Sequence, residues 1–434
     1  MTRLFYLIII SISFYSCSFN ENSKFWSNSK KLVQEKSLEF QEIFPKEEAL
    51  KKEFNSKLNL KFTSKTTNNT NVNNLLNNDG RLNFDGNLKK KSSYRFSKIE
   101  NFNQYQPEIS FHNDAIIFFD KKGSILKFND KSKLIWKKNY YSKSEKKLNP
   151  ILQFVNNKKY LIVTDNIAHY YMLDIETGNL IWSKDNFAPF NSQIKIHENK
   201  FFVIDLTNTL RCFSIENGDE LWNVKTENSL IRTQKKLSMV IIDDIIYFIN
   251  SLGDISAVNV KNGELIWQLP TQTSLLYESS FSLKNSDIIS DGENLFFSNN
   301  NNQFFSIDLE TGSFNWENKI NSNLRSTIIS DYIVSISLEG YLLILEKKSG
   351  KIIRVTDIFR NFKKKKRDQI KPIGFVVGLK EIYLSTNNGR LMIINIEDGQ
   401  IISTLKIDSE KISKPFIQNE KLFLIKNDAI IKLN

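Results

Sequence analysis

The stretch Asp174-Ile-Glu-Thr-Gly178-Asn-Leu-Ile-Trp182 decides the fold, because close copies of it return along the chain. The three clearest copies occupy residues 215–222, 260–267 and 308–316. Starting from Gly178, the turn glycines of these copies follow one another after 40, 45 and 49 residues. A repeat of this length is typical of a four-stranded propeller blade, and such blades close radially into a disc. The phrase therefore predicts an all-β propeller.

Each copy has the pattern of a β-hairpin. An apolar strand such as Tyr170-Tyr-Met-Leu173 leads into a polar turn whose glycine takes a positive φ angle, and the next short strand carries the tryptophan. Three weaker copies bring the number to seven, and they lie at Ser132 to Trp136, at Gly350 and at Gly399.

A second series of strands, upstream of the hairpins, gives the number of blades. These β-rich runs occur eight times, at residues 115–119, 159–163, 200–204, 245–249, 294–298, 332–336, 381–385 and 421–425. Only one further strand, at residues 429–433, follows the eighth run, so its blade lacks an outer strand. Because an unpaired edge invites aggregation, we expect residues 93–99 to supply that strand. The sequence therefore predicts eight blades over residues 93–434, closed by one strand from each chain end.

Tryptophans recur at one place in the hairpins, and we expect them to pack between neighbouring blades. They are Trp136, Trp182, Trp222, Trp267 and Trp316. Arg354 and Ser403 hold the matching positions in the sixth and seventh blades, which predicts looser seams there.

The first 92 residues differ in kind from the repeats. A short apolar run after Met1-Thr-Arg3 predicts a secretion signal over residues 1–16, since it is shorter than the ~20 residues of a spanning helix. Ser16-Cys17 resembles a bacterial lipoprotein cleavage site, which would make Cys17 the acylated residue; a conventional signal with an incidental cysteine is the alternative. Ser18 in place of an aspartate favours the outer membrane. Residues 17–92 are then expected to form an anchor and a partly helical or flexible tether.

Residue types that carry catalysis are sparse. Cys17 and Cys212 are the only cysteines, and Cys212 lies in an apolar strand, where we expect a core residue. The three histidines lack metal-ligand spacing, and the sequence has neither a glycine-rich phosphate loop nor a nucleophile elbow. We therefore expect no catalytic residue, no cofactor and no metal.

The net charge of +12 is densest in Lys363-Lys-Lys-Lys-Arg367, between the sixth and seventh blades. Such a run is either solvated surface or a contact for anionic lipid headgroups or an acidic protein face. Nucleic acid is not an expected partner, because a secreted protein rarely meets it and no stacking aromatics interleave the run.

The Asp-x-x-Thr-Gly-x-x-x-Trp phrase resembles the repeat of pyrroloquinoline-quinone-like propellers, over roughly residues 93–434. That family includes quinoprotein dehydrogenases, which share a neighbouring cysteine pair that is missing here, a calcium site and a catalytic aspartate. The eight blades and the lipoprotein-type signal instead resemble the propeller lipoproteins of the outer-membrane β-barrel assembly machinery. This resemblance implies a non-catalytic scaffold, held by lipid on the periplasmic face of the outer membrane.

The resemblance also implies a partner and a site. In those lipoproteins, loops joining the third, fourth and fifth blades grip the barrel-forming subunit, and one loop carries a Leu-x-Leu-Arg phrase. Ser229-Leu230-Ile231-Arg232 matches it at Arg232 and, with a close substitute, at Ile231, so Leu230, Ile231 and Arg232 are the implied binding residues. Unfolded outer-membrane proteins are a further implied partner. The next family loop carries two acids, whereas residues 282–286 have none.

Two alternatives stay open. A periplasmic quinoprotein-type oxidoreductase would need the quinone and a buried pair of acids in the central funnel. A ligand-sensing propeller lipoprotein would bind a small molecule in the channel.

Overall fold

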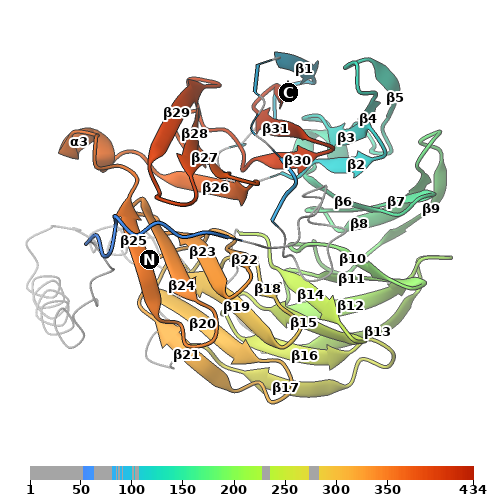
Figure 1. Ribbon diagram of the computed structural model, residues 1–434. Coiled ribbons are helices and arrows are strands. Elements are labelled where there is room, and N and C mark those ends of the chain that lie inside the picture. The colour runs from blue at the N-terminus through green and yellow to red at the C-terminus, as the bar shows by residue number, and fades with distance from the viewer. Residues whose placement is uncertain are drawn as a thin grey trace, which may run out of the picture. The chain divides into compact units, whose positions relative to one another are not determined.

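The computed structural model describes residues 52–62, 81–84, 86, 88–89, 91–99, 102, 107–226, 235–272 and 283–434. The chain divides into two compact units, Met1–Glu48 and Ala49–Asn434, and every described residue belongs to the second. Eight four-stranded antiparallel sheets form a ring in this unit (Figure 1). The predicted all-β, eight-bladed propeller is confirmed. Nothing helical in the described segments is long and apolar enough to cross a bilayer.

Each of the first seven blades takes four consecutive strands, with the first at the centre of the ring and the fourth at the rim (Figure 1). The first blade comprises β2 (Ser110–His112), β3 (Ala115–Phe119), β4 (Ile125–Phe128) and β5 (Leu134–Lys138), and the second comprises β6 (Leu152–Asn156), β7 (Tyr160–Asp165), β8 (His169–Asp174) and β9 (Leu180–Asp185). The third blade comprises β10 (Lys195–His197), β11 (Lys200–Ile204), β12 (Thr209–Ser214) and β13 (Glu220–Lys225), and the fourth comprises β14 (Met239–Ile242), β15 (Ile245–Ile249), β16 (Ile255–Asn259) and β17 (Leu265–Leu269).

Blades five to eight follow the same order. The fifth blade comprises β18 (Ile289–Ser290), β19 (Asn294–Asn299), β20 (Gln303–Asp308) and β21 (Phe314–Asn318), and the sixth comprises β22 (Thr327–Ile329), β23 (Tyr332–Ile336), β24 (Tyr341–Glu346) and β25 (Ile352–Asp357). The seventh blade comprises β26 (Pro372–Val377), β27 (Glu381–Thr386), β28 (Arg390–Asn395) and β29 (Ile401–Lys406), and the eighth comprises β30 (Phe416–Gln418), β31 (Lys421–Lys426), β32 (Ala429–Leu433) and β1 (Lys91–Arg95). Two short helical turns, η1 (Glu145–Leu148) and α3 (Lys364–Arg367), lie in connections.

The position of a strand in its blade explains its composition. The second and third strands, such as β11 and β12, are almost wholly buried because sheets cover both of their faces. Several outermost strands, such as β13, alternate between exposed and half-buried side chains, whereas β25 is buried over residues 354–357. Each hairpin of the seven consecutive blades also contains a register shift, as between Cys212 and Phe213, and such bulges increase the local twist.

The ring is closed by pairing between the two ends of the propeller sequence. β1 pairs antiparallel with β32, with Tyr94 opposite Ile430. Tyr94 is buried, and its ring lies 5.7 Å from that of Phe128 in the first blade and 6.5 Å from that of Phe423 in the eighth. The predicted closing strand is therefore confirmed, over residues 91–95 rather than 93–99.

The tryptophans do pack between blades, as predicted. Trp267 of the fourth blade donates its indole N–H to the carbonyl of Leu309, directly after the third strand of the fifth blade, at 3.0 Å. Trp182, Trp222 and Trp316 make the equivalent bond. A Cβ atom at Gly312, whose φ is 70°, would lie 2.7 Å from the Trp267 ring. Glycine is therefore required at this turn for two reasons: the backbone has a positive φ angle, and the tryptophan ring leaves no room for a Cβ atom.

The expectation of a looser seam after the sixth blade is wrong. Arg354 is fully buried, and its guanidinium donates to the carbonyl of Ile396, the residue that directly follows the third strand of the seventh blade, at 2.8 Å. It also donates to the carbonyls of Leu58, at 2.9 Å, and Glu397. Arg354 thus replaces the indole donor and adds a bond to the N-terminal segment. Ser403 is exposed, and its looser seam stays a prediction.

Parts of the N-terminal segment pack on the blades that lack tryptophan. Phe54 exchanges two backbone hydrogen bonds with Val355, of 3.1 and 2.8 Å, beside β25 (Figure 1). Leu82 and Phe84 are buried in a cluster with residues of blades seven and eight, and the Phe84 ring lies 5.0 Å from that of Tyr383. Residues 52–62 and 81–84 therefore belong to the propeller unit.

We expect Arg354→Ala to lower the free energy of unfolding by about 2 kcal/mol, because three carbonyls lose a charged donor. Urea unfolding followed by tryptophan fluorescence measures this loss. Arg360→Ala is the matched control, since Arg360 is exposed, and should change stability by less than about 0.5 kcal/mol. Equal values for the two variants would contradict the role of Arg354 at the seam.

Candidate functional site

The predicted partner loop is only partly visible. Leu230, Ile231 and Arg232 lie outside the described residues, as does Cys17. The structure does describe the two ends of this loop, at Thr226 and Lys235. Contacts at both ends hold this loop on the propeller.

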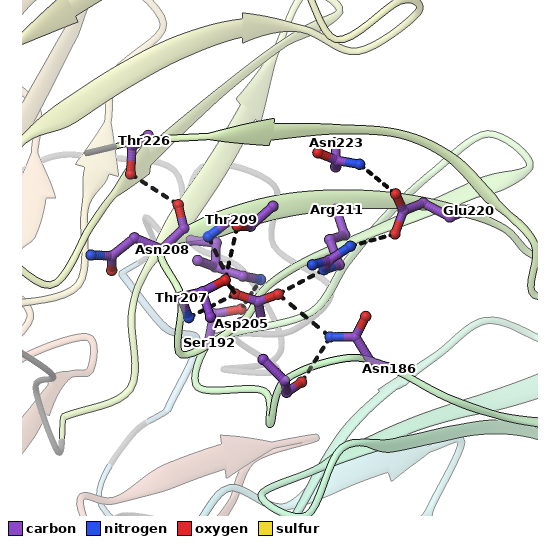
Figure 2. A network of polar contacts seen from close by, with 12 residues as sticks. Asn186, Ser192, Asp205, Thr207, Asn208, Thr209, Arg211, Glu220, Asn223 and Thr226 are labelled. Atoms are coloured by element: carbon purple, nitrogen blue, oxygen red, sulfur yellow. Dashed lines mark hydrogen bonds and ion pairs between the residues drawn. The ribbon is translucent and has the colours of Figure 1, made fainter. Parts of the chain in front are cut away.

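A polar network anchors the blade from which the loop departs (Figure 2). Its centre is Asp205, a fully buried carboxylate in the turn between β11 and β12. One oxygen accepts the backbone N–H groups of Thr207 and Thr209 at 2.8 and 3.3 Å, and the other accepts Nε of Arg211 at 2.7 Å. Arg211 also donates to Glu220 on β13, at 2.6 Å. The carboxylate is thereby paired, as a buried charge must be.

Both ends of the loop over residues 227–234 are clamped. Thr226 donates its backbone N–H and its hydroxyl to the carbonyl of Asn208, at 3.2 and 2.9 Å (Figure 2). On the other side, Leu237 exchanges backbone hydrogen bonds with residues 191 and 193, at 2.8 and 2.9 Å. The Lys235 ammonium donates to the carbonyl of Asn323. The loop therefore starts and ends on fixed points of the blade.

The next inter-blade loop, over residues 273–282, is held in the same way. The hydroxyl of Thr271 donates to the carbonyl of Gly253 at 2.8 Å, and Gln272 donates to Gln303 at 3.0 Å. At the far end, the backbone N–H of Lys284 donates to the side chain of Asn300 at 2.6 Å. Two neighbouring loops thus have rigid bases on one face of the disc.

A second polar feature lies at the centre of the ring, and sequence reasoning missed it. We call it the axial cluster; it consists of Glu108, Lys195, Lys235, Lys236, Asp287, Arg325 and Lys414, all at or just before an innermost strand. Lys236 beside the fourth blade contacts Glu108 of the first, and Lys414 of the eighth contacts Glu108 at 2.6 Å and Asp287 of the fifth at 3.6 Å. The eighth and first blades are neighbours, but the fourth blade is not next to the first and the fifth is not next to the eighth, so the Lys236–Glu108 and Lys414–Asp287 contacts cross the centre of the ring.

Serine side chains fix the backbone beside this cluster. Ser286 donates its hydroxyl to the carbonyl of Asp287 at 3.2 Å and accepts the backbone N–H of Ser298 at 2.9 Å. Ser413 does the same with Lys414, at 2.7 Å, and Ile425, at 2.9 Å. The repeated motif ties the start of the innermost strand to the second strand, so the charged side chains project from a fixed frame.

The electrostatics of the cluster follow from burial and charge. Burial alone would raise the pKa of Glu108, but Lys236 and Lys414 outweigh it and hold that pKa well below its usual range. The pKa of Asp287 is also lowered, because Lys414 and Lys235 outweigh burial. Burial lowers the pKa of Lys195 to about 7. Both carboxylates are therefore ionised at neutral pH, whereas Lys195 is close to its titration point.

The sequence and fold of this chain match known proteins. Residues 121–356, more than half of the chain, match the sequence profile of the outer membrane protein assembly factor BamB. The chain belongs to the BamB family. A search of curated protein sequences gives no match.

Solved structures share the fold of this BamB family member at low identity. BamB from Moraxella catarrhalis is 15% identical, covers 79% of this chain and 100% of its own, and has a TM-score of 0.62. The computationally designed protein Ika8 is 11% identical, with the same coverage and a TM-score of 0.58. Quinohemoprotein alcohol dehydrogenase from Comamonas testosteroni is 9% identical, covers 85% of this chain and 81% of its own, and has a TM-score of 0.62. The propeller architecture is therefore shared by a BamB and by an enzyme.

The residues at the axis of this BamB family member do not fit a calcium-bound quinone centre. Glu108 and Asp287 are a buried pair of acids, but their oxygens are bound by lysine ammonium groups. In the described segments, no three His, Cys, Asp or Glu side chains lie close enough together to hold a metal ion. Calcium requires several oxygen ligands, which this donor set does not offer.

The other residues singled out from the sequence have local roles. Cys212 is fully buried, as predicted for a core residue, and burial raises the pKa of its thiol to about 12. His112 contacts Glu176 at 2.9 Å and His197 contacts Asp244 at 2.7 Å, and neither contact involves a residue of the axial cluster. In the basic run, the four lysines are exposed, and Arg367 contacts Asp357 at 2.5 Å.

A signal for the axial cluster does exist in the sequence. A polar residue stands one to three positions before several innermost strands, often after a serine, as in Ser286-Asp287 and Ser413-Lys414. The innermost strands are short, at two to six residues, and the sequence did not locate them as a separate series. Without that register, the charged residues could not be aligned across the repeats.

Proposed function

We propose that this chain is a non-catalytic scaffold lipoprotein of the outer-membrane β-barrel assembly machinery, anchored through Cys17 on the periplasmic face of the outer membrane. The BamB family membership supports this role. The observation that carries it is the pair of inter-blade loops with clamped bases, since a binding loop on a rigid frame loses less conformational freedom when it binds. Leu230, Ile231 and Arg232 would contact the barrel-forming subunit.

Unfolded outer-membrane proteins are proposed as second partners, bound by strand addition at the rim. Among the described residues, none pairs with the outer edges of β9, β13, β17, β21 and β29, and each of these strands carries an exposed apolar side chain soon after its turn glycine. Examples are Leu180 and Ile181, at 44% and 45% exposed, and Leu265 and Ile266, at 45% and 46%. An extended amphipathic client would find both backbone partners and apolar contacts there.

The test is affinity purification of the tagged chain from membranes in mild detergent, with mass spectrometry of the bound proteins. We expect the barrel-forming subunit to copurify with the wild type and to be lost with Arg232→Glu, because one charge is reversed within the contact. Arg360→Glu, on an exposed site between blades six and seven, is the matched control and should retain the subunit.

The outcomes separate the function from its site. If the subunit copurifies with both variants, the scaffold role stands and Arg232 is not part of the contact. If the wild type recovers no such subunit, the scaffold proposal is wrong. The quinoprotein and ligand-sensing alternatives would then be tested by cofactor absorbance and by small-molecule binding.

A further inference from the structure

Two stretches that are far apart in the sequence meet at the rim of the sixth blade. Residues 52–62 run beside β25, and α3 projects outward from the connection that follows this strand (Figure 1). Asp357, the last residue of β25, joins the two stretches. Its backbone N–H donates to the carboxylate of Glu53 at 3.0 Å, and its own carboxylate contacts Arg367 at 2.5 Å. The first described residues of the propeller unit and the basic run therefore share one edge of the ring.

This edge is strongly basic. We call residues 52–61 and 363–366 the basic rim; they include seven lysines and one acidic residue, Glu53. All seven lysines are exposed, and none of them forms an ion pair with a described residue. Arg367 is instead engaged with Asp357, and the exposed Asp368 follows it. Charges of one sign that gather without partners raise the local potential, so the basic rim attracts anions over a long range.

Exposed apolar side chains lie among these lysines. Phe54 is 50% exposed and Leu58 is 40% exposed. Leu60 and Phe62 of the same segment are instead partly buried against the core of blades six and seven, and the Phe62 ring lies 5.9 Å from that of Tyr332. The segment is therefore fixed on the blades while two of its apolar side chains remain in contact with solvent.

We propose that the basic rim binds the surface of a bilayer that contains anionic phospholipids. Its lysines would attract the headgroup phosphates, and Phe54 and Leu58 would enter the boundary between headgroups and acyl chains. A folded acidic protein fits this surface less well, because protein interfaces are depleted in lysine and enriched in arginine. The inference goes beyond the scaffold role and needs neither the partner loops nor an acyl chain on Cys17.

The place of the basic rim in the chain agrees with this proposal. The chain enters the propeller unit at this edge, since residues 52–62 are the first that the structure describes. One acyl chain alone gives marginal membrane binding, whereas a lipid together with a polybasic surface gives stable attachment. The basic rim would therefore add a second attachment beside the end of the chain that leads back to Cys17.

Solvation is the competing explanation for exposed lysines. If the positive charge only keeps the protein soluble, any attraction to anionic lipid should follow the net charge and should not depend on where the lysines lie. A binding surface instead requires lysines at one place. Variants with the same net charge but with different lysines removed therefore separate the two explanations.

Vesicle cosedimentation tests the proposal. The protein is the chain from residue 17 onward with Cys17→Ser, which retains every described residue and carries no acyl chain. The two probes are vesicles of phosphatidylcholine alone and vesicles of phosphatidylcholine mixed with an equal amount of phosphatidylglycerol. We expect the partition coefficient to be at least ~10-fold higher on the anionic vesicles, and to fall as the salt concentration rises.

Two variants that each lack four exposed lysines locate the surface. The first replaces four lysines of the basic rim with serine and should weaken binding to anionic vesicles at least ~10-fold; these are Lys363, Lys364, Lys365 and Lys366. The control has the same net charge and replaces exposed lysines in or after the first blade. It should lose less than about twofold, because these charges lie outside the contact and are screened; they are Lys131, Lys133, Lys143 and Lys147.

A third variant tests the apolar part without a change of charge. Phe54→Ser combined with Leu58→Ser should weaken binding at least ~3-fold, because the contact with the acyl boundary is lost. Unchanged binding would overturn the role of these two side chains.

Three results would overturn the proposal as a whole. Equal binding to the two kinds of vesicle would exclude anionic lipid and leave an acidic protein as the candidate partner. Full binding by the variant without Lys363–Lys366 would move the contact elsewhere. An equal loss in the two four-lysine variants would mean that net charge alone drives the binding.

Discussion

Replacing Tyr94 with alanine is expected to lower the free energy of unfolding by about 3 to 5 kcal/mol, as for other large aromatic side chains in cores. Tyr94 is the buried residue of β1, and its ring contacts both the first and the eighth blades. Its loss leaves a cavity where a strand from the N-terminal end of the propeller sequence completes the eighth blade. Urea unfolding of the wild type and the variant measures the difference.

Two controls separate the ring from the strand. Arg95→Ala alters an exposed neighbour on β1 and should change stability by less than about 0.5 kcal/mol. Tyr94→Phe keeps the ring and should cost about 1 kcal/mol or less, for the hydroxyl alone. A Tyr94→Ala loss below about 1 kcal/mol would mean that β1 contributes little to closure.

Replacing Glu108 with alanine should cost about 3 to 5 kcal/mol, because it leaves two lysines without their shared carboxylate in the channel. Lys236 and Lys414 both contact Glu108, whose side chain is only 3% exposed. Chemical unfolding at pH 7 gives the value. Glu220→Ala is the matched control, since Glu220 pairs with Arg211 at the more exposed rim and should cost at most about 1 kcal/mol.

The effect of Glu108→Ala should depend on pH in a defined direction. The pKa of Glu108 in the folded protein is lowered from an ordinary value of 4.5, so the ionised form stabilises the fold. That contribution is fully present above pH 4.5 and is lost as the pH falls below it. The difference between wild type and variant should therefore shrink in acid. A difference that stays constant down to the acid limit would contradict a charge-based role.

The sequence predicted the ring because its signals are local. A positive-φ glycine followed by a short strand and a tryptophan recurs with a fixed period, and each element depends only on its neighbours. Arg354 shows where local reasoning fails. It replaces a tryptophan, but its bonds to Leu58 and Ile396 depend on segments far away in the sequence. No property of residue 354 alone indicates that the N-terminal segment lies over it.

The candidate sites divide in the same way. The resemblance implies a partner loop around Arg232, and the structure describes the two ends of this loop. Serine and polar residues before the innermost strands mark positions of the axial cluster, but the sequence does not say which charges meet, because Glu108, Asp287 and Lys414 approach one another only once the ring is closed. Charges that are hundreds of residues apart become partners through radial symmetry, which no window along the sequence can show.

The pairing of β1 with β32 also sets an order in time. Arg95 pairs with Ala429, so β1 emerges from the ribosome long before its partner is made. During that interval, at roughly 5 to 20 residues per second, the growing blades have an open edge. Closure then happens in one late step. The pairing of a single five-residue strand thereby distinguishes a closed ring from an open one.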